Sequence, residues 1–80
     1  MKELGQVIKK RGFVYTQLFA DTSGYIYRQD LNGVTVGFEV FKRKENTQFN
    51  CISFPGDNAF GIWAFTTLTI DRANEILKSF

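Results

Sequence analysis

Residues 25–44 read YIYRQDLNGVTVGFEVFKRK and place Asn32-Gly33 between two runs rich in β-branched and aromatic side chains. Asn-Gly is the strongest short signal for a β-hairpin, because a type I′ turn needs positive φ at both central residues. Alternation in the second run puts Val34, Val36, Phe38 and Val40 on one face and Thr35, Gly37, Glu39, Phe41 and Arg43 on the other. A period of two is typical of a β-strand. The stretch therefore predicts two antiparallel strands joined by a two-residue turn.

Further strand-like segments lie on either side of this hairpin, separated by short turn-forming clusters. DTSG, residues 21–24, precedes the hairpin, and ENTQ, residues 45–48, follows it. Both clusters contain residue types that turns favour. Segments rich in aromatic and β-branched side chains predict strands at residues 13–20, 24–31, 34–44, 48–54 and 61–67.

Two segments have helical periodicity instead. Residues 70–79 form an amphipathic pattern that begins after Thr69, a residue type that caps helix N-termini. Residues 2–11 repeat apolar side chains at helical spacing before Gly12, a residue type that often ends helices. The sequence thus predicts an α+β fold. We expect an antiparallel meander of four or five strands, with a C-terminal helix and a short N-terminal helix packed on one face.

Length and composition limit the size and the setting of the fold. The chain has 80 residues, of which 44% are apolar, and it includes nine Phe, three Tyr and one Trp. We therefore expect one compact domain, residues 1–80, near the lower size limit for an unassisted hydrophobic core. The start of the chain lacks the apolar stretch of a secretory signal, and Cys51 is the single cysteine. These features predict a cytosolic protein without an internal disulfide, and no apolar run predicts a membrane partner.

The chemically versatile residues that enzymes use are scarce. Histidine is absent, and one Cys without His cannot supply a four-ligand zinc site. The glycines fit neither the phosphate-binding loop nor the dinucleotide-binding spacing. We therefore expect no catalytic residue, no metal and no cofactor. Glu39 is the unusual acid, because it lies inside an apolar strand, and we expect it to pair across strands with a base such as Arg28.

The second half of the chain contains GFEVFKRK at residues 37–44 and FPGDNAFGIWAFTTLTIDRANEIL at residues 54–77. These stretches resemble a group of short uncharacterised proteins from bacterial phages and mobile elements. Their pattern is a YEVFK strand, a Pro-Ser-Asp-like turn, an FGxWAW segment and a helix that opens with a Thr cap. Residues 37–77 carry the resemblance, through Phe38, Glu39, Val40, Phe41, Lys42, Pro55, Asp57, Phe60, Gly61, Trp63, Ala64 and Ala73. The chain departs from the pattern at Gly56, which replaces Ser, and at Phe65, which replaces a second Trp. The resemblance implies an origin in a bacterial host cell and no particular activity.

The stretch PGDNAFGIWAF, residues 55–65, has two interpretations. In the first, Pro55, Asp57, Phe60 and Gly61 form a structural turn at the corner of the sheet. In the second, Trp63 or Phe60 is exposed and anchors a partner, because aromatic residues dominate interface hot spots. We favour the structural corner, because so small a core needs most of its large side chains.

Apolar side chains fall on both faces of several predicted strands, more than helices on one face can cover. A contiguous exposed apolar patch usually marks an interaction surface. We therefore expect a non-enzymatic protein that acts through protein–protein contacts, either with a second copy or with a protein partner. The phage-like resemblance favours an inhibitor or modulator of a host protein or defence complex. The candidate interaction surface comprises Tyr15, Tyr25, Tyr27, Arg28, Phe41, Arg43 and Trp63.

The alternative function is single-stranded nucleic-acid binding. Aromatic side chains on a sheet can stack on bases, and basic side chains beside them can hold phosphates. The chain has basic clusters at residues 9–11 and 42–44. Its net charge of +2 is low for a domain that binds a phosphate backbone, so nucleic acid is the less favoured partner.

Overall fold

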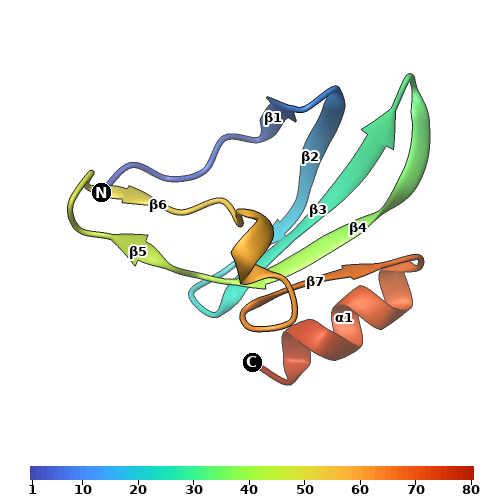
Figure 1. Ribbon diagram of the computed structural model, residues 1–80. Helices are drawn as coiled ribbons and strands as arrows, with labels where there is room; N and C mark the ends of the chain where they lie inside the picture. Colours follow the sequence, from blue (N-terminus) through green and yellow to red (C-terminus); the bar gives the residue numbers. More distant parts are fainter.

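The structure, a computed structural model, describes residues 1–80 (Figure 1). Its main element is a five-stranded antiparallel sheet in the order β1-β2-β3-β4-β7. The strands are β1 (Val7–Lys10), β2 (Phe13–Ala20), β3 (Gly24–Leu31), β4 (Val34–Lys42) and β7 (Ala64–Thr67). The predicted meander and the α+β class are thus confirmed.

The remaining elements lie on the two faces of this sheet (Figure 1). The helix α1 (Ile70–Lys78) packs against β3, β4 and β7 on one face. The segment between β4 and β7 lies on the other face and contains β5 (Glu45–Asn46), β6 (Cys51–Ile52) and the 3₁₀ turn η1 (Asp57–Ala59). The chain start joins this second layer, because Lys2 N–H donates to Asn50 O and Ile52 N–H donates to Lys2 O, both at 2.9 Å.

The two central hairpins form because their turn residues adopt the backbone that each turn needs. Asn32 and Gly33 have φ of 52° and 80°, which confirms the predicted type I′ geometry. Before β3, the Asp21 carboxylate accepts hydrogen bonds from the backbone N–H groups of Ser23 and Gly24. A short acidic side chain thereby closes the turn between β2 and β3.

The sheet has a hydrophobic cluster on each face. The larger cluster lies between the sheet and the layer that contains residues 1–6 and 43–63. Its buried members are Tyr15, Tyr25, Tyr27, Phe41, Ile52, Ala59 and Ala64. The smaller cluster lies under α1 and is built on Ile26, Val40 and Ala73. Both faces are therefore covered, although α1 covers only the half of its face formed by β3, β4 and β7.

The predicted N-terminal helix at residues 2–11 is wrong. Residues 7–10 form β1, and residues 11 and 12, with φ of 55° and 83°, make a tight turn into β2. The chain start is extended and not helical because two buried tyrosines of the sheet need hydrogen-bond partners. Tyr25 Oη donates to Glu3 and Tyr27 Oη donates to Gly5 O, at 2.9 and 2.8 Å, which holds the chain start extended.

The other boundaries differ by smaller amounts. The predicted strand 34–44 ends at residue 42, and the strand predicted at 61–67 begins at residue 64. The strand predicted at 48–54 is reduced to β6, because residues 47–50 form a turn in which Asn50 has φ of 53°. The helix predicted at 70–79 is confirmed at 70–78, and Thr69 Oγ1 accepts the N–H of Arg72 as its N-cap.

Candidate functional site

Two hollows flank β7 and are the candidates for a site. The first, which we call the β7-edge groove, has a volume of about 670 Å³. It is lined by Phe60, Gly61, Phe65, Thr66, Thr67, Leu68, Thr69, Arg72 and Ile76. The second, which we call the Glu39 cleft, has a volume of about 250 Å³ and lies on the tyrosine face of the sheet. Its lining is Lys10, Arg11, Phe13, Tyr15, Gln29, Glu39, Phe54, Pro55, Asp57, Phe60 and Thr66.

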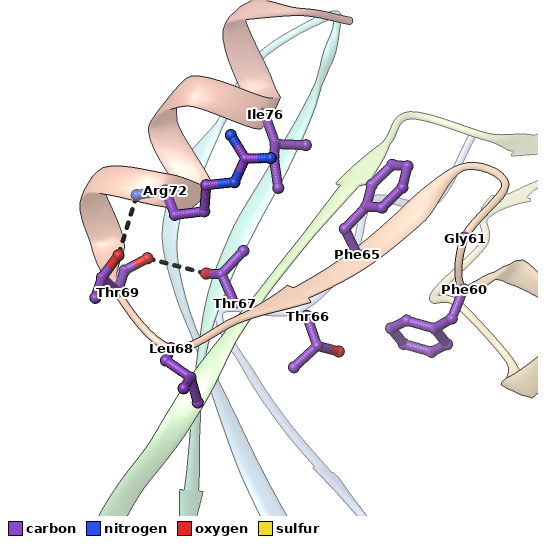
Figure 2. A pocket seen from close by; sticks show the side chains of 9 residues that line it. All are labelled: Phe60, Gly61, Phe65, Thr66, Thr67, Leu68, Thr69, Arg72 and Ile76. Carbon is purple, nitrogen blue, oxygen red and sulfur yellow. Dashed lines mark hydrogen bonds between the residues drawn. The ribbon is translucent and has the colours of Figure 1, made fainter.

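The β7-edge groove runs along β7 between the helix and the turn after η1. Figure 2 shows Phe65 and the helix residues Arg72 and Ile76 on one side, with Phe60 across β7 from them. Thr67 Oγ1 donates to Thr69 O at 2.9 Å, which fixes the corner between β7 and α1 (Figure 2). The groove therefore has a wall on each side of β7, and the wall on the helix side is anchored by this hydrogen bond.

The edge of β7 that faces away from β4 has no strand beside it, because β7 is the last strand of the sheet. Only its first residue is covered there, because Ala64 bridges to Phe60 and its carbonyl accepts the Gly61 N–H at 2.8 Å. Phe65 pairs with Val40, and Thr66 pairs with Glu39. Lys42 N–H donates to Trp63 O at 2.9 Å, and hydrogen-bonded pairs alternate along an antiparallel ladder. The backbone N–H and C=O of Thr66 consequently point away from β4, toward the open edge.

Exposed apolar side chains surround this edge. Leu68 is 84% exposed, Ile62 is 74% exposed and Phe60 is 38% exposed. Residues 64–70, AFTTLTI, contain no charge and no proline. Proteins usually protect an open edge with charged residues or proline, and β1 at the opposite edge does so, since Lys9-Lys10-Arg11 ends it. The β7 edge is thus the unprotected one.

The Glu39 cleft has an acidic floor. The Glu39 side chain lies on the tyrosine face, and the residue is 5% exposed. Its Oε2 accepts a hydrogen bond of 2.9 Å from Thr66 Oγ1. The other carboxyl oxygen accepts no hydrogen bond. Every fully buried side-chain oxygen of the protein has a hydrogen-bond partner, so this oxygen is not fully buried and opens into the cleft. Burial raises the pKa of Glu39, and the Thr66 hydrogen bond opposes that rise only in part.

The expected pairing of Glu39 with Arg28 is wrong. Arg28 pairs with Phe38 in the sheet register, one position away from Glu39, so its side chain projects from the opposite face. Its guanidinium instead lies 3.1 Å from Asp30 on the same strand. Glu39 therefore has no cation as a direct partner.

The mouth of the Glu39 cleft is basic. Arg11 forms an ion pair of 2.7 Å with Asp57, which links the β1–β2 turn to η1. The Arg11 guanidinium lowers the pKa of that carboxyl through their hydrogen bond. The Lys10 ammonium lies 5.4 Å from the centre of the Phe54 ring. Deeper in the cleft, Gln29 Nε2 donates to Tyr15 Oη at 3.1 Å.

The structure buries most of the predicted interaction surface. Tyr15, Tyr25, Tyr27 and Phe41 are core residues and cannot form an exposed patch. The prediction assumed that only helices cover the sheet, whereas an irregular layer covers the tyrosine face. The rings stack there, with Tyr27 and Phe41 centroids 5.7 Å apart.

The three other members of that predicted surface lie in different surroundings. Arg43 donates to Glu3 and to Tyr25 Oη, at 3.0 and 2.6 Å, so it helps to hold the chain start. Burial, reinforced by the hydrogen bond to Glu3, raises the pKa of Tyr25 to about 12. Trp63 is half-buried with its ring centre 6.3 Å from that of Phe41, and Arg28 lies on the helix face. The seven residues do not form one surface.

The turn motif has a structural part and an exposed part. Pro55 is buried, Asp57 begins η1, and Gly61 has φ of 85°, a value that favours glycine. These features agree with a corner of the sheet. Phe60 differs from them, because it lines both the β7-edge groove and the Glu39 cleft.

Sequence reasoning did not find Lys10, Gln29, Phe54 and Thr66 as cleft residues. The cleft combines β1, β2, β3, β4, β7 and the loop before η1, so no sequence spacing brings its members together. The only available signal was Glu39, an acid in an apolar strand.

No helix of the structure is long and apolar enough to span a bilayer. Comparisons with protein-family models, curated proteins and solved structures found no match for this chain.

Proposed function

We propose that this protein is a non-enzymatic binding module that adds a strand of a partner protein to the open edge of β7. The observation that supports the proposal is the unprotected edge itself, with the Thr66 backbone directed outward and Leu68 and Ile62 exposed beside it. An extended peptide gains affinity from main-chain hydrogen bonds when it extends a sheet. Its side chains gain specificity from pockets on either side of the strand, and here the β7-edge groove supplies them.

The groove also indicates the chemistry of the partner strand. Residues 64–70 carry no charge, and Arg72, the single charged residue that lines the groove, already pairs with Glu75 at 2.9 Å, so a charged segment would lose hydration for little gain in ion pairing. Phe65 and Ile76 on one side, and Phe60 on the other, favour apolar side chains at alternate positions of the added strand. The expected partner is therefore an uncharged, extended segment. The resemblance to phage and mobile-element proteins favours a protein of a bacterial host as its source.

The alternative function, stacking of single-stranded nucleic acid on the sheet, has less support. It requires exposed aromatic rings on the sheet face, and Tyr15, Tyr25, Tyr27 and Phe41 are buried. The low net charge of +2 also counts against extensive phosphate binding. We therefore keep protein binding as the favoured function.

The test compares the wild type with Leu68→Lys, which places a charge beside the open edge. Val7→Lys is the matched control, because Val7 is an exposed apolar residue on the strand at the opposite edge. Each protein is used to capture proteins from a nuclease-treated bacterial lysate at high salt. A partner that the wild type and Val7→Lys retain, and that Leu68→Lys loses, supports the proposal.

A second readout tests strand addition directly. In the free protein the Thr66 amide faces solvent at the sheet edge, so it exchanges its hydrogen faster than the paired amides of β4. Binding of the captured partner should slow exchange at Thr66 selectively. A partner that binds without protecting Thr66 would refute strand addition at β7. A salt-independent dimer of the purified protein that protects Thr66 would show that the edge is occupied by a second copy instead, which would refute the foreign partner.

A further inference from the structure

The Glu39 cleft contains an acid that lacks a full set of partners. Glu39 is almost completely buried, and Thr66 supplies its only hydrogen bond. A buried carboxylate is stable when donors or a cation satisfy both oxygens. The open oxygen faces the cleft, so a ligand there can supply the missing donor.

The mouth of the cleft determines which kind of donor can enter. Lys10 and Arg11 line the mouth, and Asp57 balances one of these two positive charges, so the Lys10 charge is left without a counterion. A basic mouth repels a small cation and attracts an anion. The floor and the mouth together therefore favour a ligand with uncharged N–H donors at one end and a negative charge at the other.

The walls of the cleft favour a flat ring. Phe13, Phe54 and Phe60 line it, and each can contact a planar ligand. Phe60 is in none of the aromatic pairs of the chain, so both faces of its ring are free of other rings. The volume of about 250 Å³ is smaller than that of pockets for drug-sized molecules. One ring system fits inside, and any further groups remain at the mouth.

We propose that the Glu39 cleft binds the guanine base of a nucleotide, with the phosphate at the basic mouth. Guanine carries two adjacent donors, N1–H and N2–H₂, on its Watson–Crick edge, and a carboxylate accepts both. One donor would meet the open oxygen of Glu39, and the other would meet Oε2, which has a second lone pair beside the one that accepts from Thr66. Adenine and cytosine place an acceptor beside their amino group, which a carboxylate repels. Uracil places its single N–H between two carbonyl groups. Lys10 lies at the mouth and is the cation best placed to meet the phosphate.

This site is separate from the β7 edge and does not depend on the proposed protein partner. The guanine would lie on the tyrosine face of the sheet, whereas the added strand would extend the sheet beyond β7. Only Phe60 and Thr66 line both hollows.

The test is a titration of the isotope-labelled full chain with GMP, AMP, CMP and n-butylammonium chloride, followed by NMR. We expect GMP to shift the Glu39 side-chain carboxyl and the Phe60 ring, and to bind about tenfold tighter than AMP or CMP. Equal binding of AMP and GMP would overturn the proposal. Binding of n-butylammonium at Glu39 in preference to GMP, or no shift with any nucleotide, would also overturn it.

Two variants connect binding to the named groups. Glu39→Gln keeps the shape of the side chain but replaces one carboxylate oxygen with an NH₂ group, which cannot accept a hydrogen bond from guanine. The variant should therefore lose the preference for GMP over AMP. Glu75→Gln, which changes an exposed acid on α1, is the matched control and should leave that preference unchanged. Lys10→Ala should weaken GMP binding and leave guanosine binding unchanged. An unchanged GMP preference in Glu39→Gln would refute the role of the carboxylate.

A final comparison distinguishes the two sources of a guanine with a 5′-phosphate. Tighter binding of GMP than of the dinucleotide pGpU would identify the ligand as a free nucleotide. The reverse order would identify it as a guanine in a single strand, and either order supports the guanine site. A dinucleotide without guanine, pApU, that binds as well as pGpU would refute it.

Discussion

Gly24 lies where β3 begins, under the C-terminal end of α1, and the space around it is too small for a methyl group. A Cβ added at this position would lie 2.5 Å from Phe41 O, 3.1 Å from the Phe80 ring and 3.2 Å from Leu77 Cδ1. The closest of these atoms belongs to the backbone of the neighbouring strand β4, which cannot move without disturbing the sheet. Gly24→Ala is therefore expected to separate β3 from β4 or to displace the helix end.

The size of the effect follows from two opposing contributions. Replacing Gly by Ala at an unstrained site stabilises a protein by about 0.4–1 kcal/mol, because the unfolded chain loses freedom. Forcing an extra methyl group into packed surroundings is destabilising by about 1–3 kcal/mol, and a backbone contact of 2.5 Å belongs at the upper end. The net expectation for Gly24→Ala is a loss of about 2–2.5 kcal/mol in the free energy of unfolding.

Gly56 provides the matched control. An added Cβ there meets no atom within 4 Å, and its φ of −91° is one that alanine adopts readily. Gly56→Ala should therefore raise the free energy of unfolding by up to about 1 kcal/mol. Urea denaturation followed by circular dichroism measures both variants in one assay. The reasoning is refuted if Gly24→Ala is as stable as the wild type, because the close approach of Gly24 to β4 would then be absent.

Three further predictions concern single side chains. Burial raises the pKa of Glu39 above its ordinary value of 4.5, so the contribution of Glu39 to stability is lost as pH rises from that value through the folded pKa. Glu39→Gln should remove this loss, which is measured by comparing the unfolding midpoints of the variant and the wild type as pH is raised above 4.5. Tyr27→Phe removes the hydrogen bond to Gly5 O and the one from Gln17 Nε2, and it should lower the free energy of unfolding by about 1 kcal/mol, because the carbonyl of the exposed Gly5 can bind water instead. Faster amide exchange in the chain start is the specific sign. Thr69→Ala removes the acceptor for Arg72 N–H and should lower the free energy of unfolding by about 1 kcal/mol in urea denaturation, whereas Thr69→Ser should not.

The central hairpins could be predicted because local chemistry determines them. Asn32-Gly33 requires a particular turn backbone, and alternation on either side requires strands, so β3 was predicted with its observed bounds and β4 with its observed start. The C-terminal helix was predicted for the same reason, since Thr69 and the apolar stripe lie within one segment. These elements can be predicted without knowing which distant residues they contact.

The chain start could not be predicted because distant residues decide it. Apolar side chains at residues 4, 7 and 8 fit a helix, but Tyr25 and Tyr27 need acceptors that an extended chain supplies. The same limitation affected the candidate surface. Sequence alternation shows that a strand has two apolar faces, but it does not show that a loop with little regular structure covers one of them. The Glu39 cleft depends on that loop and was therefore not found.

The order of the strands has a consequence for how the protein folds. Each of β1, β2 and β3 pairs with the next strand in the chain, so these contacts close short loops and can form rapidly. β7 pairs with β4 only after residues 43–63 have closed a much longer loop. Both candidate sites require that closure, since β7 borders one and contributes Thr66 to the other. We therefore expect the meander of β1 to β4 to form first, and the protein to acquire its binding capacity only when β7 pairs with β4 in the final step of folding.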